Sequence, residues 1–223
     1  TTAVVDNREV GVAVDDAAHL DAEGALIGFT APAALGEGGV GLAVTGGSSA
    51  TITSSAIVNN EVSGVVAEGA SVQITAHGLL VEGTQPQSST GDCGRGLEVG
   101  EGASVTLVGS ALVANHDSAL MAAGATVTIA GSLIEKTESS LEGAGRGLDA
   151  QAGARLTLSA SALLENRDIA VAAYGPGTSV TLEGDLIRGT RGQSTDGSHG
   201  GGAYGWDGAE LRLIDCAIVD NHE

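Results

Sequence analysis

The feature that most constrains this chain is a degenerate repeat, in which a glycine and alternating aliphatic residues open each copy. Three short copies align directly, GLAVTGG from Gly41, GLEVGEG from Gly96 and GLDAQAG from Gly147. Longer copies alternate with them, so the repeating unit is a pair of roughly fifty residues. The starts of the other copies are Gly11, Gly64, Ser118, Ile169 and a position near Ala203.

Each copy contains three short segments in which apolar and polar residues alternate, separated by Gly, Ser and Asn. This period of two predicts β-strands, and a strand this short buries its apolar side only by stacking on the next copy. The six-residue period of left-handed helices is absent, and right-handed crossovers are preferred. We therefore predict one all-β domain over residues 1–223, a right-handed parallel β-helix of about eight coils with alternating lengths. Its two-coil units are expected near 11–63, 64–117, 118–168 and 169–223.

One turn position alternates in register with coil length. The residue that closes the third strand is Asn in short coils and at both chain ends, and Thr in long coils. Because turn peptides lack ladder partners, we interpret this column as a structural hydrogen-bonding ladder. Its members are Asn7, Thr30, Asn60, Thr84, Asn115, Thr137, Asn166, Thr190 and Asn221.

After each of these four threonines the chain inserts roughly ten residues, such as QPQSSTGDCGR, before the next coil. Four loops are therefore expected on one edge of the helix. Loops on a rigid scaffold often carry function, although these loops would also cover Val66, Leu120, Val171 and Tyr204, which we expect to face outward. Polar and aromatic residues near this edge are the candidate binding residues: Arg95, Arg146, Arg191, Asp196, His199, Tyr204 and Trp206.

Composition excludes several partners. The formal net charge is −19 and Lys136 is the single lysine, which disfavours nucleic acid and anionic membrane surfaces. No apolar run is long enough for membrane insertion, and the first residues lack a signal-peptide pattern. No cofactor, catalytic residue or metal site is predicted, with weak Ca²⁺ binding by surface carboxylates left open. Cys93 and Cys216 are expected to lie too far apart to form a disulfide.

The repeat resembles the right-handed parallel β-helix repeat proteins of the pectate-lyase-like superfamily, specifically long secreted bacterial repeat proteins of unassigned activity. The matching pattern is the glycine-led strand, the GA turn, the Ser before the third strand, the closing Asn and the loops ending in GRG, as in GDCGRGLEV and GAGRGLDA. The resemblance covers the whole chain and implies the fold. It leaves activity open, because one fold supports many functions.

Two alternative functions to a binding module are an enzyme and an ice-binding protein. A polysaccharide hydrolase is disfavoured because Asp15-Asp16 and His199 belong to opposite ends of the stack and cannot form one site. A lyase is disfavoured because Glu98 and Asp149 are two coils apart, with Leu120 expected between them, which is too far to share a Ca²⁺ ion. An ice-binding surface is suggested by an expected outward rank of polar residues. That rank is Thr51, Gln73, Thr106, Thr128, Thr157 and Thr181, flanked by Ser49, Ser71, Ser104, Thr126 and Ser179.

The leading expectation is a non-enzymatic structural or binding module of a secreted or cell-surface protein. Its loop edge would contact a glycan or a cell-surface partner. Residues 1–9 and 215–223 share one phase of the repeat, and neither end carries a cap. We therefore expect a fragment of a longer array, or self-association end to end.

Overall fold

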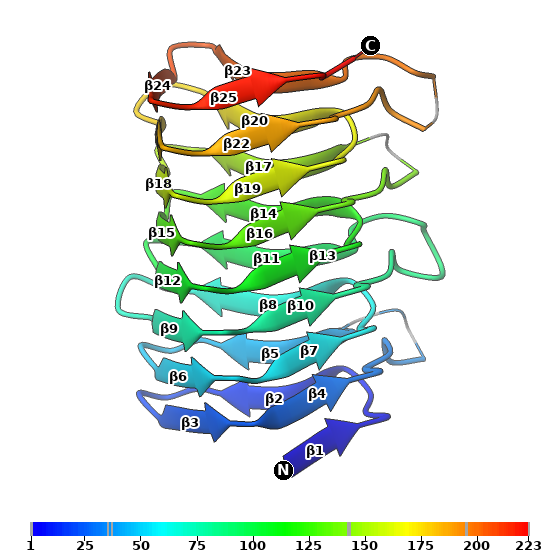
Figure 1. Ribbon diagram of the computed structural model, residues 1–223. Helices are drawn as coiled ribbons and strands as arrows, with labels where there is room; N and C mark the ends of the chain where they lie inside the picture. The colour runs from blue at the N-terminus through cyan, green and yellow to red at the C-terminus, as the bar shows by residue number, and fades with distance from the viewer. Residues whose placement is uncertain (1, 35, 37, 142–143, 195, 223) are drawn as a thin grey trace.

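The computed structural model describes residues 2–34, 36, 38–141, 144–194 and 196–222. These residues contain 25 β-strands and no helix, so none of the described elements is a helix that could span a membrane. The strands form three parallel sheets that wind into a right-handed β-helix with three strands in each coil (Figure 1), which confirms the predicted fold. Pairing is parallel throughout all three sheets.

The sheet that contains β1 has nine strands, and the other two have eight each. The nine strands are β1 (Thr2–Val5), β4 (Ala25–Gly28), β7 (Ala56–Val58), β10 (Leu80–Glu82), β13 (Ala111–Val113), β16 (Leu133–Glu135), β19 (Ala162–Leu164), β22 (Leu186–Arg188) and β25 (Ala217–Val219). The sheet that contains β2 is formed by β2 (Val10–Val14), β5 (Val40–Val44), β8 (Ser63–Glu68), β11 (Arg95–Gly100), β14 (Asp117–Ala123), β17 (Gly145–Gln151), β20 (Ile169–Tyr174) and β23 (Gly201–Trp206). The sheet that contains β3 is formed by β3 (His19–Glu23), β6 (Ser49–Thr53), β9 (Gln73–His77), β12 (Ser104–Val108), β15 (Thr126–Ala130), β18 (Arg155–Ser159), β21 (Ser179–Glu183) and β24 (Glu210–Ile214).

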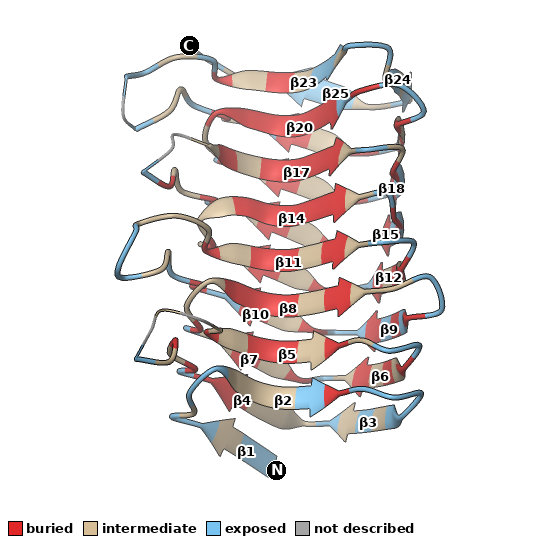
Figure 2. Cartoon of the chain, turned by 180° about the vertical axis from the view of Figure 1, so that it is seen from behind, coloured by how far each residue is buried: buried red, intermediate tan, exposed pale blue. Residues whose placement is uncertain are grey.

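The core is a set of aliphatic columns that run along the helix axis. Leu97 pairs in register with Val65 on one side and Leu120 on the other, and all three are buried. Burial is deepest in the middle coils and falls toward both ends (Figure 2). One or two aliphatic side chains per strand are enough to fill so narrow an interior, which is why the chain needs almost no aromatic residues.

The strand register corrects two sequence-based expectations. Leu120 and Val171 were expected to face outward, but both are fully buried in the inward columns. The outward neighbours are instead Met121 and Ala172, so Met121 rather than Leu120 lies between Glu98 and Asp149. A shift of one residue reverses the side on which a strand residue lies, and a strand that is apolar on both sides gives no pattern to fix it.

The two cysteines are both free and half-buried. Cys216 directly precedes β25, where its Sγ donates to the carbonyl of Ile214 at 3.2 Å. Ser55, Ser110 and Ser161 make the same type of bond before their strands. Cys216 therefore replaces a serine in a repeated turn.

Candidate functional site: the loop edge and its polar columns

The alternating Asn and Thr residues form a buried column beside the loops. Asn166 Oδ1 accepts hydrogen bonds from the Thr137 backbone N–H at 3.1 Å and from the Thr137 hydroxyl at 2.8 Å. Its Nδ2 donates to the carbonyl of Ile134 at 3.2 Å. Asn60, Asn115 and Asn221 likewise accept the backbone N–H of the Thr in the coil before them. The hydroxyls of those three threonines, at positions 30, 84 and 190, are buried without a hydrogen-bond partner among the described residues, so Thr137 is the one whose hydroxyl joins the column. The column therefore joins each short coil to the long coil before it.

The glycine that opens each short coil lies against this column. A Cβ added to Gly96 would press on the Ala119 carbonyl oxygen and lie 2.9 Å from Asn115 Nδ2. In two long coils, where the turn residue is the smaller Thr, the same position holds Ala119 and Ala170, both fully buried. The other two long coils keep a glycine there, Gly11 and Gly64, so the backbone carbonyl of the next coil restricts this position together with the asparagine amide.

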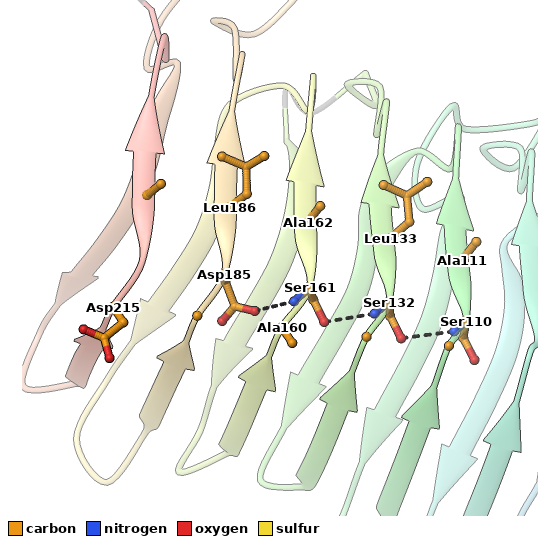
Figure 3. Close-up of a pocket in the computed structure, with 14 residues that line it drawn as sticks. Ser110, Ala111, Ser132, Leu133, Ala160, Ser161, Ala162, Asp185, Leu186 and Asp215 are labelled. Atoms are coloured by element: carbon orange, nitrogen blue, oxygen red, sulfur yellow. Dashed lines mark hydrogen bonds between the residues drawn. The ribbon is translucent and has the colours of Figure 1, made fainter.

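A second polar column precedes the strands of the β1 sheet. Ser132 Oγ accepts the Ser110 N–H at 3.1 Å, Ser161 Oγ accepts the Ser132 N–H at 3.0 Å, and Asp185 Oδ1 accepts the Ser161 N–H at 2.8 Å. Figure 3 shows these side chains aligned along one corner of the helix, in a shallow groove of about 710 Å³. Since the serine hydroxyls already bond the backbone, they stabilise the corner and leave little free to bind a ligand.

Asp185 differs from the serines of this column, because a carboxyl group that is 2% exposed takes the place of a hydroxyl group. Burial raises its pKa above the usual value, although the backbone N–H groups of Ser161 and Glu183 act in the opposite direction. A carboxyl group whose pKa is raised by folding stabilises the folded state only while it is protonated, and this contribution is lost as the pH rises through the folded pKa.

We therefore predict that Asp185→Ser raises the free energy of unfolding by about 1 kcal/mol at pH 7. The gain should disappear near about pH 3, where the unfolded carboxyl group is itself largely protonated. Urea unfolding at the two pH values measures this difference. The control is Asp21→Ser, since Asp21 is an exposed carboxylate. An unchanged or lower stability of Asp185→Ser at pH 7 would contradict the prediction.

The four loops contact one another and form a continuous layer along one edge. The Gln87 side-chain amide donates to the carbonyl of Gly36, and the Leu141 N–H donates to the carbonyl of Gly91 at 3.3 Å. The Ser194 N–H donates to Ser139 Oγ at 3.1 Å. Each loop thus bonds the next loop two coils away, and the layer extends over the length of the stack (Figure 1).

Two candidate binding residues, Arg95 and Arg146, are held in ion pairs. Arg146 Nε donates to Asp168 at 3.1 Å, and its terminal nitrogen donates to Asp149 at 2.8 Å. Arg95 makes the same pair of bonds to Asp117 and Glu98. Burial raises the pKa of Asp149, while Arg146 acts to lower it. The arginines of the two GRG segments thus fasten the ends of the second and third loops to the following coil.

His199 is attached to the same network. Its Nδ1 lies 2.8 Å from the fully buried carboxylate of Asp168, and the Gln193 side-chain amide also donates to Asp168. Asp196 accepts the Ser198 N–H at 2.8 Å, which lowers the pKa of the Asp196 carboxyl group. His199 and Asp196 therefore share the last loop, whereas Asp15-Asp16 lies between β2 and β3, at the other end of the stack.

Three of the four aromatic residues gather on the outer side of β20 and β23. Tyr174 pairs in register with Trp206, with ring centroids 5.6 Å apart and planes inclined by 47°. Tyr204 lies two residues before Trp206 on the same side, and its ring covers Gly201. Tyr174 and Tyr204 are exposed, while Trp206 is half-buried. Trp206 is at the end of β23 remote from the loop, so this cluster extends from the loop edge across the sheet.

A column of basic residues adjoins the last loop. Arg191 pairs through its backbone with Arg167 on one side and His222 on the other. These three side chains line a groove of about 660 Å³ together with residues 192–194, 196 and 197 of the last loop. The sequence alignment of short coils did not reveal this column, because Arg191 belongs to a long coil.

The threonine rank on the β3 sheet is more regular than the sequence indicated. Thr75, not Gln73, lies between Thr51 and Thr106, so six threonines are consecutive. Gln73 instead lies in the flanking rank, and Ser71 precedes β9. The complete rank is Thr51, Thr75, Thr106, Thr128, Thr157 and Thr181, ending in Asp21 and Arg212.

Comparison with protein-family models, with curated proteins and with solved structures finds no match for this chain. Within the part of the chain that the structure describes, no three His, Cys, Asp or Glu side chains gather as a metal-binding group.

Proposed function

We propose that this protein is a non-enzymatic glycan-binding module of a secreted or cell-surface protein, and that it belongs to the pectate-lyase-like superfamily. The observation that carries the binding proposal is the aromatic cluster of Tyr174, Tyr204 and Trp206. Aromatic residues make up 2% of the chain, yet three of them lie together on one outer surface. A solenoid core needs no aromatics, so these side chains are free to stack on sugar rings, which present an apolar face.

The surroundings of the cluster favour the same proposal. The last loop places Arg191, Asp196 and His199 at one end of β23, where hydrogen-bond donors and acceptors can fix the hydroxyl groups of a sugar. The rigid sheet holds the aromatic rings in place before binding, so little side-chain freedom is lost on association. The superfamily assignment is supported by the fold and by the repeat pattern.

The test uses the intrinsic fluorescence of Trp206, the single tryptophan. A glycan array identifies ligands, and titration of the protein with each one should change the Trp206 emission. Tyr204→Ala should weaken binding by about five- to thirtyfold, since stacking contributes on the order of 1–2 kcal/mol. Phe29→Ala is the matched control, because Phe29 is the exposed aromatic outside the cluster. Binding that is unaffected by Tyr204→Ala and Trp206→Ala would reject this site.

The threonine rank supports a second candidate, binding to ice. Six threonines repeat at the spacing of neighbouring strands, about 4.8 Å, on the outer side of one sheet. A regular array of hydroxyl and methyl groups offers ordered water a matching set of hydrogen-bond sites. Arg155 interrupts the flanking rank and makes the array narrower.

This candidate predicts thermal hysteresis or inhibited ice recrystallisation at high protein concentration. Thr128→Lys should abolish the effect, because Thr128 lies in the middle of the rank. Thr90→Lys, in the second loop, should leave it unchanged. A protein without either activity would exclude ice binding and leave the glycan proposal untouched.

A further inference from the structure

The groove beside the last loop combines three basic side chains in consecutive coils. Arg167, Arg191 and His222 are held in register by backbone pairing, so neighbouring members are about 4.8 Å apart along the stack. Like charges at directly opposite positions of a sheet destabilise it. The two arginines therefore repel each other, and an anion between them would relieve this repulsion.

Acidic partners within the chain compensate this charge only in part. Arg167 pairs with Glu138 at 3.2 Å, and Arg188, on the other side of the column, pairs with Asp220 at 3.3 Å. Arg191 makes no ion pair with any described residue, although the chain carries 28 acidic residues against nine Lys and Arg. Its exposed guanidinium group is thus available to a ligand.

The chemistry of the donors indicates the class of anion. A carboxylate has two oxygens, which one arginine satisfies with its two parallel N–H groups. Two guanidinium groups and an imidazole approach from three successive coils, an arrangement that matches the three terminal oxygens of a sulfate or phosphate monoester better than a planar carboxylate. Asp196 lines the same groove, where its carboxylate oxygens are placed to accept hydrogen bonds from hydroxyl groups of the molecule that carries the ester.

We infer that this groove binds a sulfate or phosphate monoester carried by a sugar, with Arg191 as its principal contact. The inference rests on the proposed glycan-binding function and names the charged group that the glycan carries. The volume of about 660 Å³ is within the range of small-ligand sites. The aromatic cluster would hold neighbouring sugar rings.

The experiment is isothermal titration calorimetry of the full chain, which measures its affinity for four probes. The probes are a sulfated oligosaccharide, a sugar phosphate, a uronic-acid oligosaccharide and a neutral oligosaccharide. We expect the sulfated or the phosphorylated probe to bind at least tenfold more tightly than the uronic-acid and neutral probes. Whichever of these two ester probes binds more tightly identifies the ester. Arg191→Gln should weaken that binding at least tenfold. Arg155→Gln, an exposed arginine on the β3 sheet, is the matched control, and unfolding curves verify that both variants are folded.

Equal binding of ester and neutral probes, or equal binding by Arg191→Gln and the unmodified protein, would overturn the inference. The same measurements distinguish failure of this inference from failure of the proposed glycan-binding function. If neutral sugars bind and Tyr204→Ala abolishes that binding while Arg191→Gln does not, the glycan module stands and the oxyanion groove is rejected. If no sugar probe or array glycan binds, both are rejected.

Discussion

Replacing Asn166 with alanine is expected to lower the free energy of unfolding by about 3 kcal/mol. The amide is fully buried and makes three hydrogen bonds, so its loss leaves the Thr137 N–H, the Thr137 hydroxyl and the Ile134 carbonyl without this partner. It also leaves a cavity between two coils. Urea unfolding followed by circular dichroism measures the change.

The control is Thr157→Ala, which removes an exposed side chain from the outer side of the β3 sheet and should change stability by less than about 0.5 kcal/mol. Hydrogen exchange should show the largest loss of protection in the coils around β16 and β19, because each coil contacts only its neighbours. A loss below about 1 kcal/mol would mean that the column contributes little to the stacking of coils.

The substitution Gly96→Ala should destabilise the protein by about 3 kcal/mol, although it adds a single methyl group. The new Cβ would press on the carbonyl oxygen of Ala119 and on the amide of Asn115. Both atoms are fixed by the parallel ladder and by the asparagine column, so neither can move without breaking hydrogen bonds. Thermal and urea unfolding provide the measurement.

Gly100 is the matched control because it lies in the same strand, β11, and a Cβ there would meet its nearest atom at 3.7 Å. Gly100→Ala should leave stability unchanged or raise it by a few tenths of a kcal/mol, since alanine reduces the freedom of the unfolded chain. If Gly96→Ala and Gly100→Ala have equal effects, steric pressure from the asparagine is not the reason for the glycine.

The polar columns were accessible to sequence reasoning to different degrees. The Asn and Thr residues recur at a fixed place in each copy, so alignment located them. The ion pairs of Arg146 with Asp149 and Asp168 were not foreseen, because Asp168 comes from the following coil and no local pattern reports that contact. The same holds for Arg191, whose neighbours Arg167 and His222 are each more than twenty residues away.

Register was the other quantity that the sequence left open. In β14, the run of Ala119, Leu120, Met121 and Ala122 is apolar on both sides of the strand, and only the pairing with β11 and β17 shows that Leu120 points inward. The threonine rank was misassigned at Thr75 for a related reason. Coil lengths vary, so counting from the start of a copy does not fix the position within a strand.

The sequence by itself determined the parallel β-helix, the alternation of short and long coils and the edge that carries the loops, because these depend on periodicity and turn chemistry within a copy. Tertiary structure alone decided which side chains meet across coils: the aromatic cluster, the bonded layer of loops and the basic groove. The physical reason is that partners in a solenoid are separated by one whole coil. Their contacts depend on exact register, which the hydrogen-bonded ladder sets and the sequence pattern leaves free.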